Sequence, residues 1–256
     1  MPERGSLGLV YRIKADLHMH STFSDGRNSP KEIILRALGK GLEAIAITDH
    51  DTFQGSIHAK RIASSEKLDI VVIIGAEIRT KQGDILVYCP SDPLEKVPQD
   101  ALELVDYSHE NNCMVVPAHP FDLRRKGIGE LVYEARWDAI EVFNAMSDPI
   151  SNKRAAEAAR ELGLPGLANS DAHVADAVGS AFNIIETNSL DPGEILSSIR
   201  AGRVTPVPGR PGMKAITSTL MWSIERRLKR RRKGPSRLDY VSDVDEDYFY
   251  GGKLHG

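Results

Sequence analysis

Cysteine is nearly absent from this 256-residue chain, which contains only Cys89 and Cys113. Two cysteines cannot build the disulfide framework on which small secreted domains depend. Each lies in an apolar, strand-like run, ILVYC and CMVVP. We therefore expect two buried free thiols, which suits a reducing cytoplasm.

Long apolar runs are missing as well. No stretch approaches the roughly 18 consecutive apolar residues that a membrane helix requires. The first residues, MPERGSLGLVYRIKAD, lack the apolar run and the small-residue cleavage site of a signal peptide. These absences predict a cytoplasmic protein that has no membrane partner.

What is present is the composition of a globular protein, with 41% hydrophobic and 27% charged residues. The net charge of −3 is unevenly distributed, because residues 214–256 contain ten Lys/Arg against six Asp/Glu. The preceding part is therefore acidic. A cation site rich in carboxylates would produce this balance, and so would an acidic surface that serves solubility.

Short β-branched runs alternate with segments of helical spacing. The runs predict strands at Glu43–Thr48, Ile70–Ile74, Asp84–Tyr88, Cys113–Pro117, Ala139–Phe143, Gly166–Asn169 and Phe182–Glu186. The segments between them predict helices at Pro30–Lys40, Gly55–Lys67, Gln99–Asn111, Pro149–Leu162 and Pro192–Ala201. Strands buried on both faces and separated by helices indicate a parallel sheet, and this number of units favours a barrel over an open sheet.

The last 46 or so residues differ in character. After the turn-rich PGRPG, residues 214–233 predict a helix that ends in ERRLKRRRK, and the tail beyond Gly234 is expected to be weakly ordered. We therefore divide the chain into a barrel at 12–210 and a basic helix with its tail at 211–256.

Metal-binding residue types follow the predicted strands. His18 and His20 lie two residues apart in an extended stretch, so both can face one ion, and Asp25 follows on a tight turn. Further polar residues stand near the ends or starts of later strands: Asp49, His50, Asp51, Glu77, Asp84, His119, Asn144, Asp171 and His173. In a barrel the carboxyl ends of the strands build the active site, which favours a shared site over hydrogen-bonded structural roles.

The segments ADLHMHSTFSDG, ITDHDT, GAEI, PAHP, IEVFNA and NSDAH resemble, in order and approximate spacing, those of the PHP (polymerase and histidinol phosphatase) family. The resemblance runs from Asp16 to His173 and more weakly to Val207. It implies a distorted seven-stranded (β/α)7 TIM-like barrel with a trinuclear metal centre at its strand ends, and hydrolysis of phosphate esters. Mixed imidazole and carboxylate ligands without thiolate favour two to three divalent Mn, Fe or Zn ions as the cofactors.

The resemblance also implies a ligand set. His18, His20, Glu77 and Asp171 correspond to ligands of a first metal, and Glu77 would bridge to a second metal at His119. The third metal would take its ligands from the loop and strand ends, at Asp25, His50 and His173. These eight residues form the expected catalytic set.

One position departs from the family pattern, because Asp84 stands where many members have histidine. A carboxylate can still ligate such cations, so Asp84 is retained as a candidate ligand. Asp49 and Asp51 are interpreted as partners that orient the ligand imidazoles.

Clustered divalent ions suit phosphoester hydrolysis, because they generate hydroxide near neutral pH and neutralise the phosphoryl oxygens. Substrate phosphate should also meet arginine, and the candidates are Arg124 and Arg125, which follow the His119 motif, and Arg210 in PGRPG. Solvated basic loops remain an alternative for each.

The predicted function is hydrolysis of a phosphate ester of a small metabolite or nucleotide by a metal-bound hydroxide at a trinuclear centre. Two alternatives remain open: an exonuclease or nucleotide phosphatase that acts on nucleic-acid ends, and a non-catalytic PHP binding module. Arg226–Lys233 could bind nucleic acid, but such basic runs are often only solvated faces, so this partner is not favoured.

Overall fold

The computed structural model describes residues 10–233 of the chain. The strands in this part are β1 (Tyr11–Asp16), β2 (Ala44–Ile47), β3 (Val71–Arg79), β4 (Asp84–Cys89), β5 (Met114–Pro117), β6 (Ile140–Asn144), β7 (Gly166–Asn169), β8 (Phe182–Thr187) and β9 (Val204–Val207). The α-helices are α1 (Pro30–Gly39), α2 (Gln54–Ser65), α3 (Ala101–Glu110), α4 (Pro149–Leu162), α5 (Pro192–Arg200) and α6 (Met213–Lys233). Short 3₁₀ turns are η1 (Leu123–Arg125), η2 (Gly129–Tyr133) and η3 (Ala175–Ala177).

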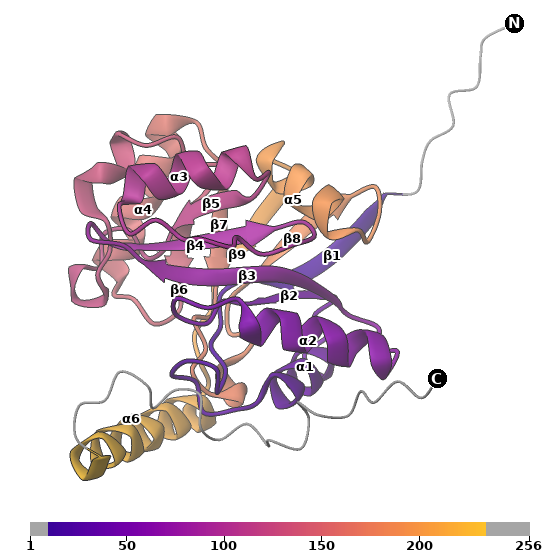
Figure 1. Ribbon diagram of the computed structural model, residues 1–256, viewed down its shortest axis with the longest axis vertical. Helices are drawn as coiled ribbons and strands as arrows, with labels where there is room; N and C mark the ends of the chain where they lie inside the picture. The colour runs from indigo at the N-terminus through magenta and orange to yellow at the C-terminus, as the bar shows by residue number, and fades with distance from the viewer. Residues whose placement is uncertain (1–9, 234–256) are drawn as a thin grey trace, which may run out of the picture.

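Seven strands form one curled sheet in the order β5-β4-β3-β2-β1-β8-β9, and β6 pairs with β7 in a second, two-stranded sheet. The small sheet contacts β5 on one side and β8 and β9 on the other. The result is an α/β half-barrel whose outer face carries helices (Figure 1). The fold class expected from the sequence is thus observed in its coarse form.

The expectation of a parallel sheet is wrong for most pairs. Only β1–β2, β2–β3 and β6–β7 run parallel among the described strands, whereas the β1–β8, β3–β4, β4–β5 and β8–β9 pairs are antiparallel. Residues 80–83 join β3 to β4 and are too few for a crossover helix, so these two strands form a hairpin. Apolar runs report burial on both faces, and burial does not fix strand direction.

Alternate residues of the strands divide the core between two sides. In β2 the small side chains of Ala44 and Ala46 pack inside the half-barrel, while Ile45 and Ile47 pack outward against α1 and α2. This period of two keeps the interior filled and leaves room for polar groups where the strands end. The metal-binding residue types lie at that end.

The helix starts follow the expected local chemistry. Ser29 caps α1 in a reciprocal capping box with Glu32, and Asp148 and Asp191 cap α4 and α5. Each of the three helices has proline in its first turn, where the missing N–H has no intrahelical partner to lose. Helix α4 ends at Gly163 in the left-handed conformation.

Cys89 and Cys113 form a disulfide, so the expectation of two free thiols is wrong. Tyr88 of β4 pairs with Met114 of β5, and this antiparallel register places the two cysteines opposite each other with Cα atoms 4.3 Å apart. The pairing joins residues 24 positions apart and depends on a strand direction that the apolar runs do not reveal. The cysteines therefore no longer support the expectation of a reducing compartment.

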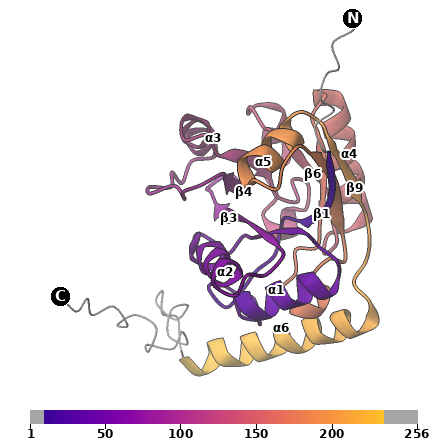
Figure 2. The ribbon, with the colours of Figure 1, turned by 90° about the vertical axis from the view of Figure 1, so that its right-hand side faces the viewer.

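Helix α6 extends along one side of the molecule, beneath α1 (Figure 2). Ile216, Leu220, Ile224 and Leu228 form a stripe on it, and all four are about half exposed. Its buried contacts come from Ala215 and Trp222 instead. Within residues 10–233, no helix combines the length and apolar character needed to cross a bilayer. The tail from Pro235, expected to be weakly ordered, lies outside the described residues.

Candidate metal centre

Eight of the sequence-predicted site residues meet at one end of the half-barrel. His18 and His20 follow β1, His50 follows β2 and Glu77 lies in β3. The remaining four come from loops after β1, β5 and β7: Asp25, His119, Asp171 and His173. They form three groups with ligand atoms close enough to hold an ion. We call these groups the inner group (His18, His20, Asp171), the bridge group (His18, Glu77, His119) and the rim group (His20, Asp25, His50, His173).

The inner group is fully buried, and its ligand atoms converge. The Nε2 atoms of His18 and His20 are 3.3 Å apart, and Asp171 Oδ1 lies 3.7 and 3.3 Å from them. Glu77 Oε2 closes the set at 3.3 and 3.2 Å from the same nitrogens. Tetrahedral ligation at about 2.1 Å separates neighbouring ligand atoms by about 3.4 Å, so these four residues fit a divalent ion.

Glu77 connects the inner group to the bridge group through its two oxygens. Oε2 faces the inner histidines, whereas Oε1 lies 3.0 Å from Nε2 of His119. One carboxylate can therefore reach two neighbouring cation positions. The bridging role that the resemblance implied for Glu77 requires such an arrangement, and it stays a prediction.

The rim group is the part nearest to solvent. Asp25 Oδ1 lies 3.2 Å from His173 Nε2, 3.7 Å from His50 Nε2 and 3.8 Å from His20 Nδ1. The side chains of Asp25, His50 and His173 are 13–18% exposed, whereas the inner group is closed off. A ligand that enters from solvent meets this group first.

The chemistry of the donor set fits cations. Several buried polar atoms have no hydrogen-bond partner among the described residues: Nδ1 of His20, His50 and His119, and Oδ1 of Asp25, Asp84 and Asp171. Buried polar atoms normally find partners, and bare imidazole nitrogens and carboxylate oxygens are the ligands of Zn, Mn and Fe. Divalent ions would satisfy this set.

Burial and neighbouring charges shift the pKa values of the histidines and carboxylates of the centre in different directions. Burial lowers the pKa of His20, but the neighbouring carboxylates of Asp171 and Glu77 outweigh this effect and raise it to about 10. Burial lowers the pKa of His50 to about 4. Burial raises the pKa of Asp171, but the Arg125 guanidinium and His18 outweigh it and hold that pKa well below its usual range. The Asp171 carboxylate therefore stays ionised, and positive charge at the site stabilises it.

Glu141 was missed from the sequence and organises the centre. It is fully buried in β6, and Oε1 lies 2.9 Å from His18 Nδ1. Its oxygens also accept from the His119 backbone N–H at 2.7 Å and from the amides of Asn144 and Asn169 at 3.0 and 2.9 Å. Its signals in the sequence are an acidic residue inside the buried run AIEVF and its place in the segment IEVFNA, and neither assigns it a role.

Two residues of the centre adopt left-handed backbone conformations that are unusual without glycine. His119 has φ 32° and Asp171 has φ 48°. Such conformations persist only where surrounding contacts impose them, and they cluster at functional sites. Here the contacts are those of His119 N–H with Glu141 and of Asp171 with Asn144.

Comparison with known families agrees with this geometry. Residues 16–123 match the model of the PHP domain, and residues 149–204 match that of the PHP-associated family. An uncharacterised protein of Methanocaldococcus jannaschii is 30% identical over 146 residues, which cover 52% of this chain and 82% of that protein.

The chain belongs to the PHP family.

Two further relatives extend the comparison of this PHP protein. A 5′-3′ exoribonuclease of Haemophilus influenzae is 48% identical over 67 residues, which cover 26% of this chain and 24% of the exoribonuclease. In a crystal structure, a two-domain protein of Bacteroides vulgatus with a predicted PHP-like metal-dependent phosphoesterase shares the fold at TM-score 0.66 and 22% identity. The match covers 78% of this chain and 66% of the Bacteroides chain.

Asp84, where the PHP pattern usually has histidine, stands beside the three groups without belonging to them. It begins β4, and its Oδ1 is buried without a hydrogen-bond partner. Burial and the neighbouring Glu77 charge raise the pKa of Asp84 to about 7. Its metal-binding role stays a prediction.

The two aspartates around His50 do not contact ligand imidazoles, contrary to the interpretation from sequence. Asp49 accepts from the backbone N–H and hydroxyl of Ser21 at 2.7 and 2.6 Å and from the Ser24 hydroxyl, and so holds the loop that carries Asp25. Asp51 is exposed and accepts from the backbone of Arg79 at 2.9 Å. Both aspartates therefore hydrogen-bond to residues around the candidate ligands and not to the imidazole rings themselves.

The three arginines proposed for phosphate lie in different places. Arg125 reaches the centre, where its guanidinium pairs with Asp171 Oδ2. Arg124 is 72% exposed and pairs with Asp122 and Asp148. Arg210 lines a separate pocket, described below. Of these three arginines, Arg125 alone is at the metal-binding groups.

Proposed function

We propose that this PHP protein is a metal-dependent phosphoesterase that hydrolyses the phosphate ester of a small metabolite or nucleotide. The observation that carries the proposal is the convergence of three histidine–carboxylate groups that share His18 and His20, with an arginine beside them. Surface residues arranged by chance would not share buried ligands in this way. A non-catalytic binding module would have no chemical use for such a set.

In this proposal, the three groups hold two to three divalent ions. Ions so placed supply an activated water and neutralise charge on phosphoryl oxygens. Glu77 is the residue that would keep two of the positions adjacent, because its oxygens face different groups. His18 would bind through Nε2, because Glu141 occupies its Nδ1.

Arg125 is the residue that would bind the substrate phosphate. One end of its guanidinium holds Asp171 Oδ2, while its Nε is buried and has no hydrogen-bond partner among the described residues. A planar guanidinium can donate to two groups at once, and phosphate oxygens match its geometry. The unpartnered Nε is therefore available for a substrate that bridges from the ions to the loop.

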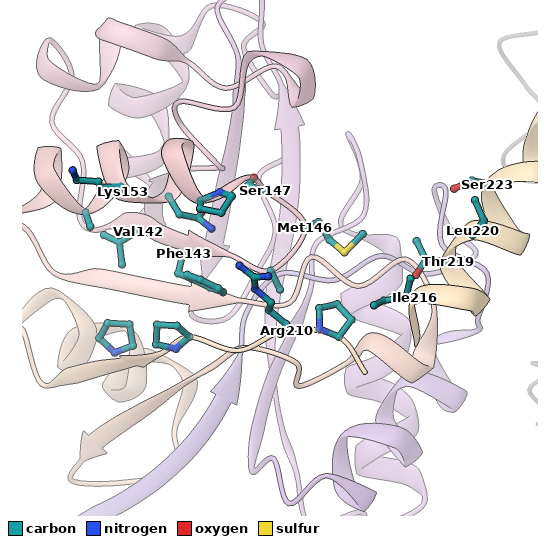
Figure 3. A pocket seen from close by; sticks show the side chains of 17 residues that line it. Val142, Phe143, Met146, Ser147, Lys153, Arg210, Ile216, Thr219, Leu220 and Ser223 are labelled. Atoms are coloured by element: carbon teal, nitrogen blue, oxygen red, sulfur yellow. The ribbon is translucent and has the colours of Figure 1, made fainter. Parts of the chain in front are cut away.

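A pocket of about 960 Å³ offers space for the leaving group. None of its described lining residues is a candidate metal ligand, but its walls come from two segments that touch the centre. Phe143, Ala145 and Met146 flank Asn144, whose amide donates to Asp171 at 3.0 Å, and Leu220 belongs to α6. Figure 3 shows Phe143, Met146 and Arg210 around the middle of this pocket. Its apolar walls suit a substrate larger than a bare phosphate.

Cleavage at nucleic-acid ends is the second candidate function. The specific observation in its favour is the 48% identity with the Haemophilus exoribonuclease over 67 residues. Arg226 of α6 adds positive charge at the rim group, where it pairs with Asp25. Phosphate contacts of this kind would weaken steeply with salt.

The experiment is metal analysis combined with a substrate panel. The purified protein should contain more than one divalent ion per chain, and it should hydrolyse either phosphomonoesters or short oligonucleotides. His50→Ala and Asp171→Asn should abolish this turnover, since each removes a ligand without emptying the hydrophobic core. Equal residual activity in both variants and wild type, or a folded protein that retains almost no metal, would refute the proposal.

A further inference from the structure

Helix α6 lies beyond both family segments, the second of which ends at residue 204, yet it contacts the loop of the rim group. In Figure 2 it runs beneath α1. Its first half is anchored on Asp176 of η3, which accepts from Lys214 at 3.0 Å and from Ser218 at 3.1 Å. Its second half reaches Asp25.

Asp25 receives several hydrogen bonds from α6. The indole N–H of Trp222 donates to the Asp25 backbone oxygen at 2.9 Å, and Arg226 donates to the same oxygen at 3.0 Å. The Arg226 guanidinium also pairs with Asp25 Oδ2. On the same loop, Arg27 forms a 3.3 Å ion pair with Glu225. The helix therefore fixes both the backbone and the carboxylate of a residue in the rim group.

The two carboxylate oxygens of Asp25 lie in different environments. Oδ2 faces Arg226, whereas Oδ1 faces the rim histidines and is buried without a hydrogen-bond partner among the described residues. The two carboxylate oxygens of Asp171 differ in the same way: Arg125 and Asn144 donate to Oδ2, whereas Oδ1 has no hydrogen-bond partner among the described residues. In each case an arginine holds the outer oxygen and leaves the inner oxygen for a cation.

We propose that α6 is a working part of the metal centre, in which Arg226, assisted by Trp222, is a positioning residue that orients Asp25 for divalent-cation binding in the rim group. This inference rests on the proposed function, because it requires that the centre binds metal. Partners that hydrogen-bond to ligating groups fix their orientation, and their loss typically weakens metal binding about 10- to 100-fold.

Two effects of Arg226 oppose each other. Its positive charge repels a cation in the rim group, while its hydrogen bonds hold Asp25 in the binding orientation. The Arg226 side chain is 31% exposed, so water screens the repulsion. Asp49 holds the backbone of the loop through Ser21 and Ser24, but the outer oxygen of the Asp25 carboxylate pairs with Arg226, so loss of Arg226 frees that carboxylate to rotate. Orientation therefore dominates, and removal of the guanidinium should weaken metal binding.

The experiment compares Arg226→Ala with Arg227→Ala in the full chain, because the second variant removes the same charge from the next, exposed position of the helix. Mn²⁺ alone is titrated into each metal-free protein by calorimetry, and bound metal is counted after dialysis. We expect the affinity of one Mn²⁺ site to fall about 10- to 100-fold in Arg226→Ala and to stay at the wild-type value in Arg227→Ala. The thermal midpoint of the metal-free proteins checks that all variants are folded.

Two further variants separate orientation from charge. Arg226→Lys keeps the charge but not the fork of donors, so it should recover only part of the affinity. Trp222→Phe removes one donor to the Asp25 backbone and should weaken the same site. Equal or tighter Mn²⁺ binding by Arg226→Ala overturns the inference while leaving the proposed function intact. Absence of Mn²⁺ binding in wild type overturns both.

Discussion

His18 and Glu141 are joined by a contact of 2.9 Å between Nδ1 and Oε1, and both side chains are fully buried. Because a carboxylate can only accept, the contact places a proton on Nδ1, so Nε2 is the nitrogen that would bind a metal. The same carboxylate accepts from the His119 backbone N–H at 2.7 Å. One acidic residue that is not a candidate ligand thus orients ligands of both the inner and the bridge groups.

Replacement of Glu141 by glutamine should weaken metal binding and the fold together. Four donors point at its two carboxylate oxygens, but an amide offers only one oxygen and adds an N–H group that faces donors. We expect a loss of about 1–3 kcal/mol in the free energy of unfolding and a metal affinity reduced about 10- to 100-fold. Urea denaturation of the metal-free protein and metal titration measure the two effects.

Glu134→Gln is the matched control for this prediction, because Glu134 is exposed. It should change the free energy of unfolding by less than about 0.5 kcal/mol. If Glu141→Gln binds metal as tightly as Glu134→Gln, then Glu141 does not orient the ligands.

Replacement of Arg125 by alanine should reduce catalysis far more than replacement of Arg124. Arg125 pairs with Asp171 inside the centre, whereas Arg124 is 72% exposed and pairs with Asp122 and Asp148. Loss of one group that stabilises developing charge costs on the order of 10²-fold in rate, so kcat/KM should fall by about that factor in Arg125→Ala. Steady-state kinetics on the same phosphoester would show nearly unchanged values for Arg124→Ala. Similar losses in both variants would mean that the phosphate is bound elsewhere.

Replacement of Gly26 by alanine should disturb the loop that carries Asp25. A Cβ at residue 26 would lie 2.1 Å from the backbone oxygen of His20, so the loop must move. We expect a loss of about 1–3 kcal/mol in unfolding free energy and weaker metal binding in the rim group. Gly39→Ala is the control, since its Cβ meets nothing within 4 Å at the end of α1 and should be neutral or stabilising. Wild-type metal affinity in Gly26→Ala would contradict the prediction.

The positions of helices and strands could be predicted well because they depend on local signals. Helix α4 was predicted at Pro149–Leu162 and β7 at Gly166–Asn169, and both bounds are those observed. The direction of the strands could not be predicted, because Asp84–Cys89 reads as a buried strand whether it runs with or against β3. Apolar periodicity records which faces are covered and leaves pairing unspecified.

Within the site, residues at strand ends could be found because position and residue type coincide there. His50 lies shortly after the buried strand β2, and His119 lies shortly after the buried strand β5. Both belong to the groups that the structure brings together. The roles of Glu141 and Arg226 could not be predicted from the sequence, for a different reason. Their roles come from what they face across the fold, His18 and Asp25, and neither stands in a motif that marks such a contact.

The disulfide between Cys89 and Cys113 supplies the last prediction. It closes a loop with a sequence separation of 24 residues, and a loop of this size is expected to contribute about 3 kcal/mol to the free energy of unfolding. Reduction should therefore lower the urea stability of wild type by about that amount and leave the Cys89→Ala/Cys113→Ala variant unchanged. Thiol labelling of the unreduced, denatured protein is the direct check, because a formed bridge leaves neither cysteine reactive. Two labelled thiols per chain before reduction would show that the cysteines are free, as their apolar surroundings alone had suggested.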